Sequence, residues 1–255
     1  MMFARPGRQQ TEQETRRKAV KIEVATETRD AIINRIEAGV DEQDERGRQK
    51  LIGPSEIGTP CDFCLGAKLA GVEKKREFNW LAWLGTLVHA GLEKFFRPFK
   101  SQWLTEFKVT VGEIDGQEIT GSLDLFDQDR STVVDFKLKG DRPLDKARFS
   151  GEMDEEYRVQ GHLYGHGLTK AGYKVRNIAV FYLPRNVWIK KPKELGSRGF
   201  WWAEEYDEGV ATKALQRADR LARDIRELGA DFVLPTLGKA EGCYDCPRWK
   251  WGGIA

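Results

Sequence analysis

Residues 121–140 read GSLDLFDQDRSTVVDFKLKG. Two β-rich runs flank the polar turn at 128–130, so the segment predicts a hairpin of two antiparallel strands. Pairing about that turn places Asp124 opposite or next to Asp135 on the neighbouring strand. Lys137 lies two residues after Asp135, and strand residues two apart project from the same face. The hairpin therefore predicts two carboxylates and an ammonium group close together.

This grouping has a chemical consequence. Adjacent carboxylates repel unless a cation neutralises them, and their oxygens suit Mg²⁺ or Mn²⁺. A lysine beside such an ion can orient a water molecule and stabilise phosphoryl charge. The alternative is an exposed strand with ordinary surface charges. Against it, Asp135 directly follows the apolar pair Val133-Val134.

Hydrophobic periodicity extends the hairpin into a fold. Helices are predicted in the later part of 22–39 and over 79–97, 152–171 and 207–228, and strands over 105–114, 117–127, 131–140, 177–185 and 201–206. This order predicts an α/β fold with a mixed central sheet flanked by helices. Residues 1–20 are polar and basic, which predicts a flexible tail before a single domain over 21–255.

The four cysteines form two C-x-x-C pairs, Cys61 with Cys64 and Cys243 with Cys246. No secretory signal or membrane-length apolar run accompanies them, so a cytoplasmic location is expected. There, paired C-x-x-C indicates shared metal ligation before disulfides. Four unrelated buried cysteines or a redox-active pair are the alternatives. A shared metal would join an early segment to the C-terminal segment.

The chain of 255 residues has 42 basic and 40 acidic side chains, a formal charge of +2. This balance excludes a protein that coats DNA through bulk positive charge, yet a local basic groove is compatible with it.

Four motifs follow one another between the two cysteine pairs. They are GTLVH (85–89), GSLD (121–124), VVDFK (133–137) and QGHLY (160–164). In this order the chain resembles the PD-(D/E)XK nuclease superfamily. Within it the likeness is to RecB-like nucleases with an iron–sulfur cluster, namely the CRISPR-associated adaptation exonucleases, their phage-encoded relatives and the AddB-type nuclease domain.

The resemblance implies a restriction-endonuclease-like core and a role for each motif residue. His89, Asp124, Asp135 and the Phe136 carbonyl would hold a divalent ion, Lys137 would position the attacking water or the phosphate, and Gln160 and Tyr164 would contact Lys137 or the DNA backbone. The implied activity is a Mg²⁺- or Mn²⁺-dependent DNA exonuclease in recombination, repair or phage DNA processing, located in the host cytoplasm if phage-encoded.

The chain departs from the family pattern in two places. Related nucleases often carry one upstream and three downstream cysteines, whereas this chain has two and two. A [4Fe–4S] cluster is favoured, and zinc in a Cys₄ site is the alternative. Leu123 also replaces the proline of the superfamily's name.

Further residues are assigned around the motifs. A basic rim for DNA is predicted from Lys139, Arg142, Lys146, Arg148, Arg185, Lys190 and Lys191, the last three with a solvated loop as alternative. Glu106 is interpreted as a solvated strand residue rather than an accessory acid. His162 and His166 are expected on the surface or near DNA.

The expected partners are single-stranded or duplex DNA ends, and a recombination or adaptation protein; an oligomer is compatible with the sequence. The rival function is a non-catalytic DNA-binding recombination or repair protein with a structural zinc or iron–sulfur site.

Overall fold

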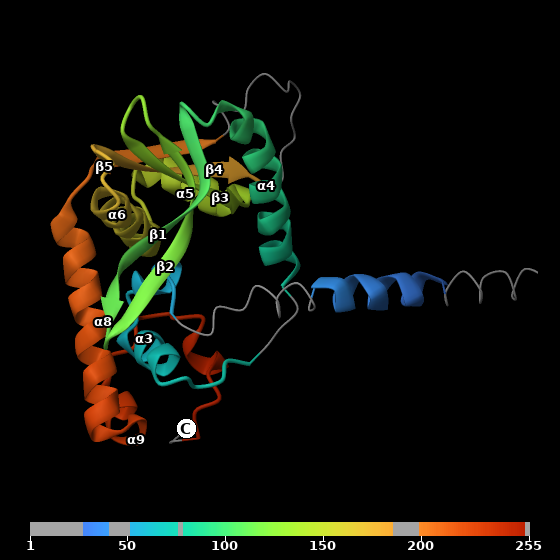
Figure 1. Cartoon of the computed structure of the whole chain (residues 1–255). Helices are drawn as coiled ribbons and strands as arrows, with labels where there is room; N and C mark the ends of the chain where they lie inside the picture. The colour runs from blue at the N-terminus through green and yellow to red at the C-terminus, as the bar shows by residue number, and fades with distance from the viewer. Residues whose placement is uncertain (1–27, 41–51, 76–78, 186–198, 253–255) are drawn as a thin grey trace, which may run out of the picture. The chain divides into compact units, whose positions relative to one another are not determined.

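A computed structural model describes residues 28–40, 52–75, 79–185 and 199–252 (Figure 1). The chain divides into two compact units, Met1–Arg48 with Phe78–Trp80 and Gln49–Glu77 with Leu81–Ala255. In the first unit a helix spans 28–40, as predicted, and exposes Ile32, Ile33 and Ile36. The predicted tail, residues 1–20, lies outside the described residues. The second unit holds the sheet and both candidate sites.

The second unit is built on one five-stranded mixed sheet in the order β1-β2-β3-β4-β5. The strands are β1 (Trp103–Ile114), β2 (Gln117–Asp127), β3 (Thr132–Lys139), β4 (Asn177–Pro184) and β5 (Phe200–Glu205). β3 and β4 are parallel, and the other neighbours are antiparallel. The predicted strands and the α/β class are confirmed.

The helices are α2 (Pro54–Ile57), α3 (Asp62–Leu69), α4 (Trp80–Phe96), α5 (Asp141–Ser150), α6 (Glu155–Lys170), α8 (Glu208–Leu228) and α9 (Ala230–Val233), with short 3₁₀ turns at Arg97–Phe99, Leu234–Thr236 and Cys246–Arg248. The sequence did not predict α5. Its buried contacts come from Leu144 and Ala147 alone, which pack with Val180 and Tyr182 of β4. Two apolar residues give too weak a periodic signal to reveal a helix.

The core has two main layers. α6 and α8 pack with β1–β4 through a cluster that includes Leu163, Leu215 and Ile178. In a second cluster, α4 packs against β2, β3 and β4 through Val88, Leu92 and Phe96. The apolar face predicted for α4 is therefore only partly covered: Leu87 and Phe95 are exposed. Within the part of the chain that the structure describes, no helix is both long and apolar enough to span a membrane.

Candidate active site and cysteine site

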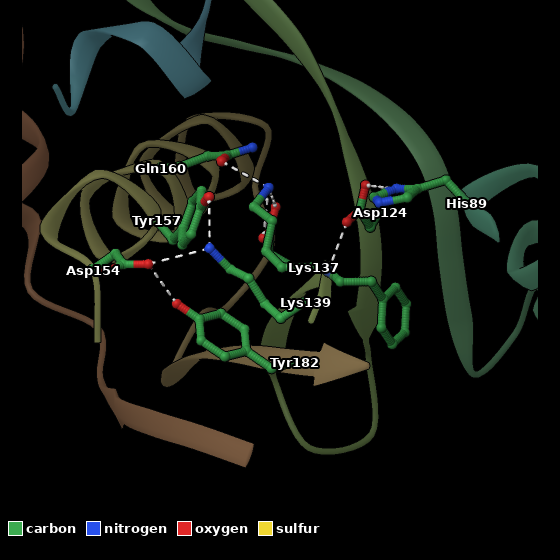
Figure 2. Close-up of polar contacts among 10 residues, drawn as sticks. His89, Asp124, Lys137, Lys139, Asp154, Tyr157, Gln160 and Tyr182 are labelled. Carbon is green, nitrogen blue, oxygen red and sulfur yellow. Dashed lines mark hydrogen bonds and ion pairs between the residues drawn. The ribbon is translucent and has the colours of Figure 1, made fainter. Parts of the chain in front are cut away.

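Three ligand-type side chains meet where α4, β1 and β2 approach one another. One ligand atom each from His89, Glu106 and Asp124 lies within 4.8 Å of the others. His89 Nδ1 is 3.0 Å from Asp124 Oδ1 (Figure 2). That hydrogen bond, against the effect of burial, raises the pKa of His89. Imidazole and carboxylate groups in this arrangement are able to bind a cation.

Asp124 also joins β2 to β3. The paired register of these strands ends at Leu125 and Val134, which confirms the predicted alignment, since one further step brings Asp124 level with Asp135. There Asp124 Oδ2 accepts the backbone N–H of Phe136 at 2.8 Å (Figure 2). Both backbone polar groups of a strand residue project to the same side. The Phe136 carbonyl is therefore directed toward Asp124 as well.

The next group is buried. Asp135 is 1% exposed, and its Oδ1 accepts from Lys137 Nζ at 3.0 Å. Lys137 Nζ also donates to Gln160 Oε1 at 3.1 Å (Figure 2). Lys137 Nζ is also 2.9 Å from Asp135 Oδ2, so both oxygens of the buried carboxylate lie against the ammonium. The residues that the hairpin predicted together do lie together.

Burial dominates the electrostatics of Asp135. It raises the pKa of this carboxyl to about 6, although the nearby Lys137 ammonium opposes the shift. A buried ion pair is costly for stability, because its attraction has to offset the desolvation of both charges. Such costs concentrate where function requires them.

Glu106 departs from regular strand geometry. Its φ is +47°, a left-handed conformation that non-glycine residues rarely adopt. Burial and the charge of Asp124 both raise the pKa of Glu106. The sequence interpretation was half right: Glu106 is exposed, as expected, but its carboxylate belongs to the group of three rather than to the solvent alone.

The glycine of the GSLD motif has a packing role. A Cβ at Gly121 would lie 2.7 Å from Pro54 Cγ and 3.1 Å from Tyr164 Cε1. Glycine thus lets Tyr164 of α6 lie directly over β2. Burial raises the pKa of Tyr164, so this hydroxyl stays protonated and acts as a hydrogen-bonding group.

Two predicted positions are wrong. His162 and His166 were expected at the surface, but they are 0% and 6% exposed. His162 Nε2 is 2.5 Å from Glu204 Oε1, and His162 Nδ1 accepts the N–H of Asp207 at 3.2 Å. They lie on the side of α6 that packs against β5 and α8, which the sequence pattern of α6 does not reveal.

The residues of the predicted basic rim differ in exposure and in whether they are paired. Arg142, Lys146 and Arg148 are exposed on α5, and Arg185 is exposed after β4. Arg148 pairs with Asp145 at 3.3 Å. Lys139 is held by Asp154 and Tyr157. Lys190 and Lys191 lie outside the described residues.

Tyr157 is a residue that the sequence analysis missed. Its ring centroid is 4.9 Å from Lys137 Nζ and 4.4 Å from Lys139 Nζ. The available signal was its position on α6, three residues before Gln160, which places both on one helix face.

The four cysteines cluster as predicted. Cys61 Sγ is 3.4 Å from Cys246 Sγ, and Cys64 Sγ is 3.5 Å from Cys243 Sγ and 3.7 Å from Cys246 Sγ. All four are free thiols. Although burial opposes ionisation, backbone hydrogen bonds lower the pKa of Cys61 to about 7. The cluster brings the C-terminal segment against the start of α3.

Exonucleases are among the solved structures that this chain resembles in fold. An alkaline exonuclease from Laribacter hongkongensis matches with a TM-score of 0.50 and 12% identity, over 75% of this chain and 95% of that one. A structure of the same alkaline exonuclease, called LHK-Exo, in complex with dAMP matches with a TM-score of 0.48 and 13% sequence identity. The match covers 72% of this chain and 91% of that one. A phage-related exonuclease from Haemophilus somnus matches with a TM-score of 0.42 and 13% sequence identity, over 64% of this chain and 80% of that one. No family model and no curated protein sequence matches the chain.

The first of these similarities shows the fold class: the chain has an exonuclease-like α/β fold. Its sequence is too different for the similarity to show more than the fold.

Proposed function

We propose that this protein is a Mg²⁺- or Mn²⁺-dependent DNA nuclease that acts at DNA ends. The observation that carries the proposal is the buried Asp135, which shares the Lys137 ammonium with Gln160, together with the neighbouring group of His89, Glu106 and Asp124. The exonuclease-like fold supports it.

The donor set fits a hard divalent cation. Glu106 and Asp124 supply carboxylate oxygens and His89 an imidazole nitrogen, all within 4.8 Å of one another, and we assign Asp135 as a further ligand. The Phe136 carbonyl completes the set that we assign. When bound, Mg²⁺ or Mn²⁺ supplies Lewis-acid polarisation of a phosphate and lowers the pKa of a bound water.

The chain's own residues supply positioning and charge. Gln160 and Asp135 hold the Lys137 ammonium in one place, from which it stabilises negative charge on a phosphate oxygen. Asp124 keeps His89 oriented through its Nδ1 contact. Tyr164 packs Gln160's helix onto β2 beside Gly121.

End-labelled single-stranded, duplex and circular DNA, each with Mg²⁺ or Mn²⁺, tests the proposal. We expect cleavage of linear DNA and little of circular DNA, lost in Lys137→Ala and Asp135→Asn. Lys213→Ala, an exposed lysine on α8, is the matched control. Unchanged cleavage in Lys137→Ala means that this active site is wrongly assigned.

We further propose that the cysteines bind a single tetrahedral ion, zinc by ligand type. A Zn–S bond of about 2.3 Å implies sulfurs about 3.8 Å apart, close to the observed 3.4, 3.5 and 3.7 Å. In the [4Fe–4S] cluster that the resemblance favours, each thiolate binds a different iron, so these sulfurs would have to move apart. Elemental analysis decides: about one zinc in a colourless protein supports the proposal, and iron in a brown protein contradicts it.

A further inference from the structure

Two residues beyond Lys137, Lys139 carries a second ammonium group into a polar cluster (Figure 2). Lys139 Nζ donates to Tyr157 Oη at 3.0 Å and to Asp154 Oδ2 at 3.3 Å. The ring centroids of Tyr157 and Tyr182 lie 4.4 and 5.0 Å from Nζ. Tyr182 Oη also donates to Asp154 Oδ2, at 2.9 Å. One carboxylate oxygen is therefore held by an ammonium and a phenol.

The cationic side of this cluster is fixed, and its anion is exposed. The Lys139 side chain is 18% exposed, whereas that of Asp154 is 61% exposed. Tyr182 is buried in the core beside α5. An exposed ion pair of this kind is weak, so another anion can replace the Asp154 carboxylate at little cost.

Asp154 also forgoes its usual role. It is the N-cap of α6, yet its side chain makes no capping hydrogen bond. Asp normally stabilises a helix in that position by accepting a backbone N–H. Here the carboxylate accepts from Lys139 and Tyr182 instead, so this cluster supplies hydrogen-bond donors to an anion in place of the helix N–H groups.

The spacing relates the cluster to the active site. Lys137 and Lys139 project from the same side of β3, and the ring of Tyr157 lies near both ammonium groups. Two strand residues span about 6.6 Å, comparable to the distance between successive phosphates of an extended nucleic acid strand. The partner of Lys137 is buried Asp135; the partner of Lys139 is exposed and replaceable.

We propose that Lys139, Tyr157 and Tyr182 form a second phosphate subsite, one nucleotide from the reacting phosphate, and that Asp154 occupies it in the free protein. The inference rests on the proposed nuclease function and specifies its substrate contact. The ligand is a phosphodiester of the bound DNA strand, which accepts from Lys139 Nζ and the two phenols.

Binding of a fluorescein-labelled single-stranded oligonucleotide, followed by anisotropy with Ca²⁺ over a salt series, tests the subsite. Loss of one phosphate contact in Lys139→Gln should weaken binding about fivefold at 0.1 M salt and reduce the salt slope by about 0.7. Asp154→Asn keeps an acceptor for Tyr182 but removes the competing charge, so binding should tighten about two- to fivefold. The double variant should bind like Lys139→Gln alone.

The controls are Lys213→Gln and Asp224→Asn, which make the same charge changes at exposed positions of α8; they should leave affinity unchanged. The subsite is refuted if Lys139→Gln binds like the wild type. It is equally refuted if Asp154→Asn tightens binding as much in the Lys139→Gln background, because the effect would then be general charge. Thermal melting checks that each variant folds. DNA binding with these effects but no cleavage by the wild type would remove the nuclease proposal and leave the subsite.

Discussion

At the scale of single residues, Glu106 combines backbone strain with a ligand-type side chain. Its neighbours Thr105 and Phe107 pair with Leu125 and Leu123 of β2, while Glu106 itself is skipped in the register opposite Asp124. A left-handed residue there turns the side chain out of the regular strand alternation. The strain therefore serves to bring a third ligand to His89 and Asp124.

This strain predicts a reversed order of stability between two variants. In an ordinary strand, alanine is more stable than glycine by about 0.5–1 kcal/mol. At φ +47° alanine keeps the steric energy cost that a Cβ imposes on a left-handed backbone, whereas glycine, which has no Cβ, does not. Glu106→Gly should therefore be more stable than Glu106→Ala by about 1 kcal/mol. Urea unfolding measures the difference, and both variants should lose metal-dependent cleavage. If alanine proves the more stable, the strain is not present in solution.

His162 predicts a pH dependence of stability. Burial, followed by the neighbouring Arg158 charge, lowers the pKa of His162 despite its contact with Glu204. The folded pKa thus lies below the unfolded value of about 6.5, so the unfolded chain gains protons first as the pH falls. The contribution of His162 to the free energy of unfolding is therefore fully present above that pH. Below it the free energy of unfolding declines, by up to about 2 kcal/mol at pH 5.

Urea unfolding of the wild type and His162→Gln from pH 8 to pH 5 isolates this effect. The stability advantage of the wild type over His162→Gln should shrink toward pH 5. Only the wild type has an imidazole that takes up a proton more readily in the unfolded chain than in the folded protein. A constant difference across the series would mean that His162 does not titrate in this way.

At the scale of elements, the cysteine site joins the C-terminal segment to α3 within a small apolar cluster, in which Trp249 and Trp251 pack against buried residues such as Phe63 and Leu234. Lys74 pairs with Trp249 in an isolated bridge, and Lys250 N–H donates to the Glu73 carbonyl at 2.7 Å. Arg217 of α8 fixes the start of α3 through Asp62 at 2.7 Å. This apolar cluster is separate from the two clusters that pack on the sheet, so ligation of the four thiolates should hold the C-terminal segment in place.

Removal of the cysteine-bound metal should therefore release this segment without unfolding the sheet. Hydrogen exchange after chelation, or in Cys246→Ser, should become fast over residues 243–250 and remain slow in β3 and β4. Glu241→Gln, a charge change beside the site at an exposed residue, should exchange like the wild type. Global loss of protection would show instead that the site stabilises the whole unit.

The elements differ in how far the sequence could predict them. β2 and β3 form one local hairpin about a short polar turn, so Asp124, Asp135 and Lys137 could be placed from spacing alone. The cysteine cluster followed from chemistry, because four thiols in two pairs suggest one metal. Tyr157, Asp154 and the buried His162 depend on how α6 packs against β3 and β5, and packing between distant segments leaves no local pattern in the sequence.

At the scale of the whole molecule, a net charge of +2 hides an uneven distribution. Glu106 and Asp124 bring two carboxylates to the candidate metal group, and Asp135, whose pKa burial and the Asp124 charge raise, is almost fully buried beside Lys137. Arg142, Lys146 and Arg185 are exposed near the end of β3 and β4. DNA affinity should then come from a few local contacts rather than from the total charge.

The salt dependence of binding tests this distribution. Four phosphate contacts, by Lys139, Arg142, Lys146 and Arg185, predict a slope of log K against log salt of about −2.8 for single-stranded DNA. Because each cation contributes separately, the double variant Arg142→Gln/Lys146→Gln should reduce the slope by about 1.4, whereas Lys213→Gln on α8 should not change it. A wild-type slope twice as steep would mean that DNA contacts many more cations than this rim. An unchanged slope in the double variant would mean that DNA approaches the active site from a side other than α5.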